Sequence, residues 1–298
     1  MLRRYGKDAE APCCQGSHFY LLNLALNKPV DEMKTITDIG NFWTAVRRLN
    51  TLPSGFPSEL WWRGQPATSM DVLPSVFRKE LFRDGWTEQK ERDLTLRFLT
   101  RAPMRHPKWV DSDYPHCLAM MRHHGLDTRL LDWTESPLFA LFFAVQEGRY
   151  EDDDAAIWAF CPAQLNQIEF GRHVLLSPYS EPEVKALFET PFIDVTVVQD
   201  VPSAPRKVAA VVLREVDIRM SVQLSGFTVH GDPKPLNCRL DSGCFMHQLQ
   251  IPKSAKPELR KQLLLLGVRE SNLFPDLDHL AQQLNRDART ENEKNLAN

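Results

Sequence analysis

The sequence lacks an apolar run of about 18 residues, the length at which a membrane-spanning helix is expected, and it lacks any Cys-x-x-Cys pair. Its six cysteines are spread over 298 residues without paired spacing, which argues against a disulfide framework. Residues 1–16 carry two arginines but no apolar core behind them, so they do not form the pattern of a secretory signal. We therefore expect a cytoplasmic protein with reduced cysteines and no membrane attachment.

Four common catalytic signatures are also missing. The sequence has no G-x-x-x-x-G-K-[ST] phosphate loop, no G-x-G-x-x-G, no H-E-x-x-H and no G-x-S-x-G. These absences argue against a P-loop NTPase, a Rossmann enzyme, a zincin and an α/β-hydrolase.

Charge of one sign is not in large excess, because the formal net charge is −3. The whole molecule is therefore not expected to attract nucleic acid, although a local basic face can still do so. With 43% apolar residues and no linker-like stretch, we expect a single domain over residues 31–285. Residues 1–30 would be an N-terminal extension, and residues 286–298 a frayed polar tail.

Helical patterns dominate the first half of the chain, and strand patterns dominate the second. Helices are predicted over 31–50, 87–101, 111–124 and 137–147, with Thr87 and Ser136 as N-caps. The first helix would bury Ile39, Phe42, Trp43, Val46 and Leu49. A short strand is expected over 60–63, and later strands over 155–161, 192–201, 207–216, 221–231 and 243–252. This order predicts an α+β fold with a mixed or antiparallel sheet in its C-terminal half.

The first cluster with chemical potential is "WWRGQP", residues 61–66. Arg63 at a strand end offers a bidentate fork to a phosphate or carboxylate, and Gly64 would let the backbone approach the ligand. Gln65 extends the polar run. Alternatively, the arginine only bonds to local carbonyls at a sharp turn.

A second cluster lies in residues 120–145, where His123 and His124 stand side by side on what is predicted to be a tight loop. Arg129 and Asp132 are expected to pair across the turn, with Trp133 covering them. The imidazoles can move protons near neutral pH. The alternative is a loop pinned by the Arg–Asp pair. A metal site made from His123, His124 and Asp132 is a third interpretation. It is weaker than the other two, because adjacent histidines do not easily bind one ion.

Two further clusters follow. Gln223 and Thr228 are expected to be hydrogen-bonding groups in one apolar strand, where they need either a ligand or a structural partner. Residues 271–281, "SNLFPDLDHLA", suit the start of a helix whose positive end attracts Asp276 and Asp278, which is a structural role.

Taken together and in this order, these clusters resemble the FRG domain family, named for an aromatic–Arg–Gly signature. The matching stretches are "WRGQ" (62–65), "LPSVFR" (73–78), "RHHGLDTRLLDWTESPLFALFFA" (122–144), "QLSGFTVHG" (223–231) and "NLFPDLDHLA" (272–281). The resemblance spans about residues 36–285. It departs from the family pattern at Trp62, where Phe or Tyr is usual, at Asp127, where Pro is common, and at Leu224 and Ser225.

FRG domains are associated with bacteria and phages, and the resemblance implies a part in a defence or toxin system, where a partner protein is possible. It implies a shared pocket without naming a reaction. The order of the clusters is also similar to that of ADP-ribosyltransferases, in which an Arg or His of the first strand anchors NAD and a late Glu positions the nucleophile. Arg63 would be the anchor here. Gln223 stands nearest to the late Glu, and an amide cannot act as a base.

Three functions follow from these patterns. The first is a nucleotide- or nucleic-acid-directed enzyme, most concretely an NAD-using, ADP-ribosyltransferase-like one. The second is a non-enzymatic nucleotide- or nucleic-acid-binding sensor, helped by a basic strip of Arg97, Arg101, Arg105, Lys108 and Arg122. The third is a metal-dependent nuclease. Catalytic roles are expected for Arg63, His123, His124 and Asp132, and ligand-binding roles for Gly64, Gln65, Arg129, Gln223 and Thr228.

Overall fold

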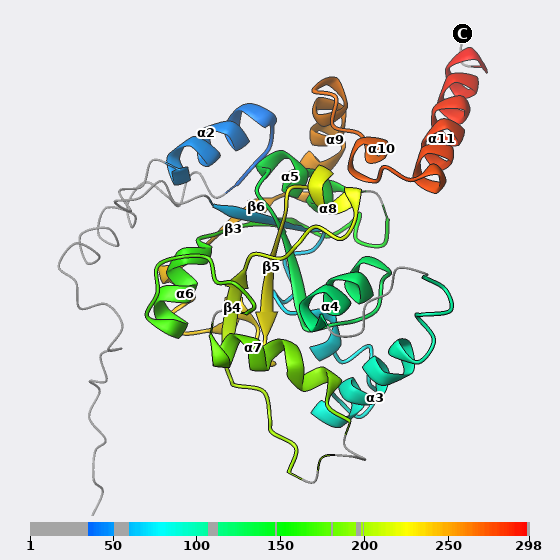
Figure 1. The fold of residues 1–298 in the computed structure, drawn as a ribbon. Coiled ribbons are helices and arrows are strands. Elements are labelled where there is room, and N and C mark those ends of the chain that lie inside the picture. The colour runs from blue at the N-terminus through cyan, green and yellow to red at the C-terminus, as the bar shows by residue number, and fades with distance from the viewer. Residues whose placement is uncertain are drawn as a thin grey trace, which may run out of the picture.

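The computed structural model describes residues 35–50, 60–106, 113–146, 148–179, 181–194, 198 and 200–296 (Figure 1). Its centre is a six-stranded sheet with the strand order β4-β5-β2-β1-β3-β6. All neighbouring strands are antiparallel. The strands are β1 Trp61–Gln65, β2 Leu130–Thr134, β3 Ala155–Phe160, β4 Val208–Val211, β5 Ser225–His230 and β6 Met246–Ile251.

Helices surround this sheet, so the predicted α+β class and antiparallel sheet are confirmed. They are α2 Ile39–Asn50, α3 Glu88–Leu99, α4 Tyr114–His123, α5 Pro137–Val145, α6 Pro162–Phe170, α7 Pro182–Glu189, α8 Ile218–Val222, α9 Lys256–Leu265, α10 Glu270–Leu273 and α11 Leu277–Leu296. The predicted division into a helical first half and a stranded second half is wrong, because β1 and β2 form the middle of the sheet from the first half. Each has five residues, too few to outweigh the helical patterns around it.

One face of the sheet carries two separate hydrophobic clusters. Over β1, β3 and β6, residues of α2, α5 and α9 pack around Trp62, Ile157 and Leu249. Over β2, β4 and β5, residues of α4 and α7 pack around Leu130 and Val229. The opposite face holds a third cluster rich in aromatic residues, including Trp61, Trp133 and Phe160. The two helical groups therefore meet above the boundary between β1 and β2.

At that boundary the sheet opens. A single residue pair, Trp62 with Thr134, joins β1 to β2, whereas five pairs join β1 to β3 and five join β2 to β5. Beyond Trp62 the two central strands separate. A sheet that parts in its middle exposes backbone groups that would otherwise be paired, so the opening is a natural place for side chains or ligands to bind.

Two predicted helix N-caps, Thr87 and Ser136, are confirmed. Thr87 accepts a hydrogen bond from the Lys90 amide at the start of α3, and Ser136 accepts one from the Phe139 amide at the start of α5. Helix α5 is buried as its composition predicts, with Ala140, Leu141, Ala144 and Val145 inaccessible to solvent. Helix α4 also buries the expected residues, Cys117, Leu118 and Met121.

Other predictions differ from the structure. Helix α2 begins only at Ile39, because Thr35 forms a bridge to Gln250 at the edge strand, and Trp43 is 60% exposed instead of buried. No strand is found in the described part of 192–201. Helix α11 continues to Leu296, so the described part of the expected tail is helical. The expected extension, residues 1–30, lies outside the described residues.

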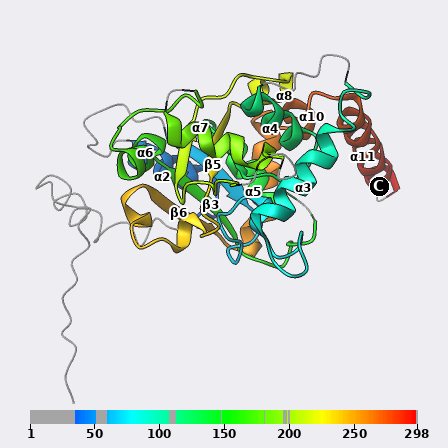
Figure 2. The ribbon, with the colours of Figure 1, turned by 60° about the horizontal axis from the view of Figure 1, so that its bottom comes forward.

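Helices α8 and α10 lie side by side, and α11 projects away from the body beyond them (Figures 1 and 2). The contact includes Gln223, which ends α8 and whose side-chain amide donates to the Leu273 carbonyl at 2.9 Å. This hydrogen bond joins α10 to α8, next to the opening between β1 and β2.

Candidate functional site

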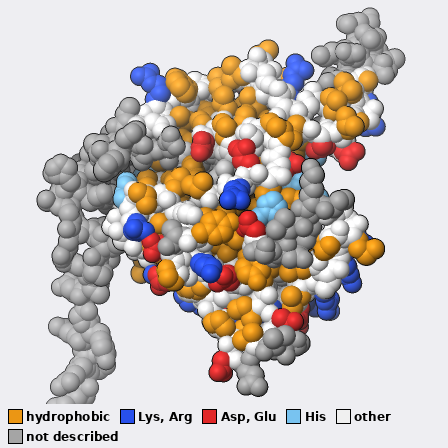
Figure 3. Space-filling model, in the orientation of Figure 1, with side chains coloured by type: hydrophobic (Ala, Val, Ile, Leu, Met, Phe, Trp, Pro, Cys, Tyr) orange, Lys and Arg blue, Asp and Glu red, His pale blue; other side chains and the backbone are white. Residues whose placement is uncertain are grey.

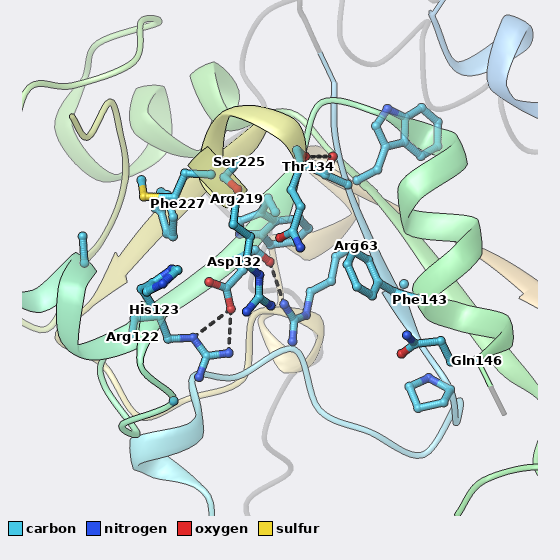
Figure 4. A pocket seen from close by; sticks show the side chains of 18 of the residues that line it. Arg63, Arg122, His123, Asp132, Thr134, Phe143, Gln146, Arg219, Ser225 and Phe227 are labelled. Carbon is cyan, nitrogen blue, oxygen red and sulfur yellow. Dashed lines mark hydrogen bonds and ion pairs between the residues drawn. The ribbon is translucent and has the colours of Figure 1, made fainter. Parts of the chain in front are cut away.

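A cavity of about 460 Å³ lies where β1 and β2 separate. Its walls come from β1, β2, the end of α4, the segment after α5, helix α8 and the start of β5. The space-filling view shows basic, acidic and histidine side chains gathered near the middle of this face (Figure 3). The close-up shows that Arg63, Asp132 and Arg219 point toward one another in its centre (Figure 4).

Arg63 reaches from β1 across the opening. Its terminal nitrogen Nη1 donates to the main-chain carbonyl of Asp132 at 2.6 Å, an acceptor that is available because β1 and β2 no longer pair there. Its Nε is buried and has no hydrogen-bond partner in the part of the chain that the structure describes. Burial lowers the Arg63 pKa to about 10, an effect that Asp132 partly opposes. A buried, incompletely bonded guanidinium is costly, so an additional acceptor at this position would stabilise it.

Asp132 organises the cationic side of the cavity. Its Oδ2 accepts hydrogen bonds from Nε and Nη2 of Arg122, at 2.9 and 2.6 Å. Burial by itself would raise the pKa of Asp132, but Arg122, with help from Arg63 and Arg219, lowers it below its ordinary value. The carboxylate is therefore ionised at neutral pH, and it holds together arginines that would otherwise repel one another.

Helices α4 and α8 contribute His123 and Arg219. The Arg219 guanidinium carbon lies 4.4 Å from the centre of the Phe274 ring, and burial lowers its pKa. His123 Nε2 lies 3.8 Å from the Asp217 carboxylate, at the edge of ion-pair distance. Burial is the main cause that lowers the His123 pKa below its ordinary 6.5, so its imidazole is neutral at pH 7.

Two other expected site residues line the same cavity, but their surroundings differ from the expectation. A Cβ on Gly64 would lie 1.9 Å from the Ala140 carbonyl oxygen, so glycine is required there for α5 to pack on β1. Gln223 was expected within a strand. It instead forms the C-cap of α8, because β5 begins only at Ser225.

Four expected residues do not line the cavity, namely Gln65, His124, Arg129 and Thr228. Gln65 is buried at the end of β1, where it donates to the Asp71 carbonyl and accepts from Trp158. Thr228 is buried on the opposite face of the sheet, bonded to Trp133 and His230. His124 follows α4, and its ring meets the edge of the His123 ring with the centroids 4.9 Å apart.

The expected Arg129–Asp132 pair is wrong. Arg129 lies in the bend just before β2 and its side chain is directed to α3 and α7, whereas Asp132 lies within β2 and faces the cavity. Arg129 is fully buried and donates from Nε and Nη2 to both oxygens of Glu91, at 2.8 and 2.7 Å, and from Nη1 to Thr190. Trp133 likewise faces away from Asp132 and stacks on Phe160. The expected loop is found only over residues 124–129, and Asp132 and Trp133 lie in strand β2.

The sequence interpretation missed much of the cavity. Arg122 was assigned to a basic strip, although it lies in the matching stretch 122–144, and Arg219, four residues before the stretch 223–231, was assigned no role. The remaining cationic and polar lining includes Arg149, Thr134 and Ser225. The other arginines of the strip, Arg97, Arg101 and Arg105, are exposed on or just after α3, and Lys108 lies outside the described residues.

The residues proposed for a metal site, His123, His124 and Asp132, do not form a set of ligands in the described structure. Asp132 accepts two hydrogen bonds from Arg122, while His123 lies 3.8 Å from the Asp217 carboxylate. Within the described ranges, no group of three His, Cys, Asp or Glu side chains could hold a metal ion. The nuclease hypothesis therefore has no ligand set in the described structure.

We expect an Asp132→Asn substitution to lower the free energy of unfolding by about 1–2 kcal/mol, since the half-exposed ion pair is partly screened by solvent. Because the Asp132 pKa is lowered in the folded protein, the stability that Asp132 contributes depends on pH. It is complete above the ordinary pKa of 3.8 and is lost as the pH falls toward the lower folded-state value.

Urea unfolding of both proteins between pH 3 and pH 7 measures this difference. The gap between wild type and Asp132→Asn should be largest at neutral pH and should shrink on acidification. A gap that grows as the pH falls would show that Asp132 is not stabilised as a carboxylate.

The comparisons with known proteins bear on the family. Neither the curated proteins nor the solved structures gave a match to this chain. Among the described residues, no helix is long and apolar enough to cross a membrane. One family model, that of the FRG domain, matches residues 58–153. This range contains β1, α4, β2 and α5, and with them Arg63, Arg122, His123 and Asp132, but it ends before α8 and β5. Residues 58–153 are therefore similar to the FRG domain, and this range supplies the arginine–aspartate centre of the cavity.

Proposed function

We propose that the cavity binds a nucleotide through its phosphates, and that the protein is an ADP-ribosyltransferase-like enzyme whose substrate is NAD. The observation that carries this proposal is the state of Arg63. Its guanidinium is buried, faces the cavity, makes one hydrogen bond to a carbonyl and leaves Nε without a partner among the described residues. Phosphate oxygens are suited to accept from such a fork.

The charge of the cavity supports an anionic ligand. Its described lining contains four arginines, Arg63, Arg122, Arg149 and Arg219, and a single acidic residue, Asp132. A pyrophosphate would offset the excess positive charge that remains after Asp132 is paired. The volume of about 460 Å³ is typical of small-molecule sites.

The residues around this centre suit transfer from a nucleotide. Arg63, Arg122 and Arg219 would bind the pyrophosphate, and the polar groups of Thr134, Gln223 and Ser225 would contact the ribose. In the reaction, the bond between ribose C1′ and the nicotinamide nitrogen breaks, and nicotinamide leaves with the bonding electrons. An acceptor oxygen forms the new bond to C1′, and its proton passes to the neutral imidazole of His123.

The test is to incubate the purified protein with NAD and to separate the products by chromatography. Nicotinamide release that disappears in an Arg63→Ala variant supports the proposal. If a high concentration of enzyme neither binds NAD in calorimetry nor releases nicotinamide, NAD is not the substrate.

A second candidate is a non-enzymatic sensor that binds a nucleotide or nucleic acid in the same cavity. It is favoured by Gln223, which replaces the expected Glu and whose amide is engaged with Leu273. Binding without nicotinamide release would identify this function. If the ligand is nucleic acid, the exposed arginines of α3 predict a steep loss of affinity with salt, and a flat salt dependence would reject it.

A role in a bacterial or phage defence or toxin system, in the cytoplasm and with a partner protein, is part of the same proposal and is supported by the FRG domain. Expression of the wild type in bacterial cells should slow growth, whereas equal amounts of Arg63→Ala should not. Equal growth with both proteins would contradict a toxic activity of this cavity.

A further inference from the structure

The cavity has two unlike sides. Figure 4 shows Asp132, Arg122 and His123 on one side of Arg63, with Phe143 and Gln146 on the other. The second side is completed by Tyr150, by Arg149, whose guanidinium carbon lies 5.2 Å from the Tyr150 ring centre, and by Pro66. We name Pro66, Phe143, Gln146, Arg149 and Tyr150 the aromatic wall. Flat apolar and aromatic surfaces of this kind suit a nucleobase, which stacks on them without needing a charged partner.

The aromatic wall has little secondary structure of its own. Helix α5 ends at Val145 and β3 begins at Ala155, so most of the wall belongs to the connection between them. Such a connection needs contacts from elsewhere to keep its side chains in place. Those contacts come from α9, which packs beside α5 (Figure 1).

Two cations one turn apart on α9 hold the connection. Lys256 donates from Nζ to the main-chain carbonyls of Tyr150, at 2.6 Å, and of Pro66, at 2.9 Å. Arg260 donates to the Val145 carbonyl at 2.8 Å and pairs with Glu151. Arg260 thus binds both ends of the connection, at Val145 and at Glu151.

The position of Lys256 is energetically unfavourable for a charged ammonium group. Its side chain is fully buried, and burial lowers its pKa although the charges of Glu151, Asp153 and Asp154 partly oppose this effect. It also begins α9, where the helix dipole disfavours a positive charge. Burial of an ammonium group costs free energy unless hydrogen bonds replace its water. The two carbonyls provide that replacement, and both belong to the aromatic wall.

We propose that Lys256 is a positioning residue that fixes the aromatic wall as the nucleobase side of the cavity, so that the site prefers a nucleotide to a bare phosphate. This inference rests on the proposed nucleotide-binding function. It predicts that the loss of Lys256 weakens binding of the base while leaving the arginine side intact.

The experiment compares Lys256→Met, which keeps the length of the side chain, with Lys261→Met, an exposed lysine on the same helix. Titration calorimetry with ADP and with inorganic pyrophosphate separates the two sides of the cavity, and thermal unfolding confirms that each variant is folded. Lys256→Met should weaken ADP about tenfold or more and pyrophosphate less than about threefold. Lys261→Met should change neither. Equal losses for both ligands, or unchanged ADP binding, would overturn the inference.

Two further measurements keep the inference testable if Lys256→Met does not fold or if no ligand binds. Tyr150→Ala should show the same selective loss of ADP, and equal losses of ADP and pyrophosphate would count against the wall. Amide hydrogen exchange over Gly148–Glu151 should be faster in a Lys256→Arg variant than in Lys261→Met, and unchanged exchange would show that Lys256 does not hold the wall. Failure of the wild type to bind either ligand contradicts the proposed function, whereas this exchange result does not depend on it.

Discussion

Replacement of Arg63 by alanine should reduce the affinity for NAD by about 10- to 150-fold while the protein remains folded. The estimate follows from hydrogen bonds to charged groups, which contribute about 1.5–3 kcal/mol each, and tenfold in affinity corresponds to about 1.4 kcal/mol. Arg63 supplies the one guanidinium nitrogen in the cavity that is buried without a partner among the described residues. Its removal therefore takes away a donor that no neighbouring arginine replaces.

Titration calorimetry with NAD measures this effect. Arg63→Lys keeps the charge but not the planar fork, so its affinity should lie between those of the wild type and Arg63→Ala. Arg105→Ala is the matched control, because this arginine is exposed and does not line the cavity. If Arg63→Ala is folded and binds NAD within about threefold of the wild type, Arg63 does not contact the ligand.

The second large effect concerns stability and lies away from the cavity, where Arg129 is buried against α3 and α7. Substitution of Arg129 by methionine should lower the free energy of unfolding by about 3–5 kcal/mol, since it leaves the buried Glu91 carboxylate without its bidentate partner. Glu91 retains only the bond from Trp86 Nε1, at 3.1 Å, among those described. A double variant with Glu91→Leu should recover part of the loss, because it removes the unpaired charge.

Urea unfolding of the single and double variants tests this pair. Lys185→Met provides the control, because Lys185 and Glu189 form an exposed i,i+4 pair whose loss should cost less than about 0.5 kcal/mol. An Arg129→Met variant as stable as the control would show that the pair does not hold α3 to the sheet. Loss of NAD binding by a folded Arg129→Met would instead revive its expected role at the ligand.

The sequence predicts the elements whose ends have strong local signals. The Ser136–Pro137 start and the apolar run behind it specify α5, and Thr87 specifies the start of α3. Strand β2 was missed because "LLDWT" follows a histidine-rich turn and alternates only over five residues. Its identity depends on pairing with β5, a partner about 95 residues away, which no local pattern reveals.

The site was predictable in type but not in pairing. Arginine, histidine and aspartate in one motif predict a ligand-binding site. The structure brings Arg63, His123, Asp132 and Gln223 to one cavity. Which arginine meets Asp132 depends on the face that each side chain takes. Arg122 reaches Asp132 from α4, whereas Arg129, in the bend before β2, is paired with Glu91 of α3. Lys256 could not be found at all, because its partners are backbone carbonyls.

A crystal structure of the protein grown or soaked with NAD tests the central claim most directly. The account predicts the pyrophosphate between the separated ends of β1 and β2, with a phosphate oxygen within hydrogen-bond distance of Arg63 Nε and the base against Phe143 or Tyr150. A nucleotide bound on another surface, or an empty cavity at saturating NAD, would contradict it.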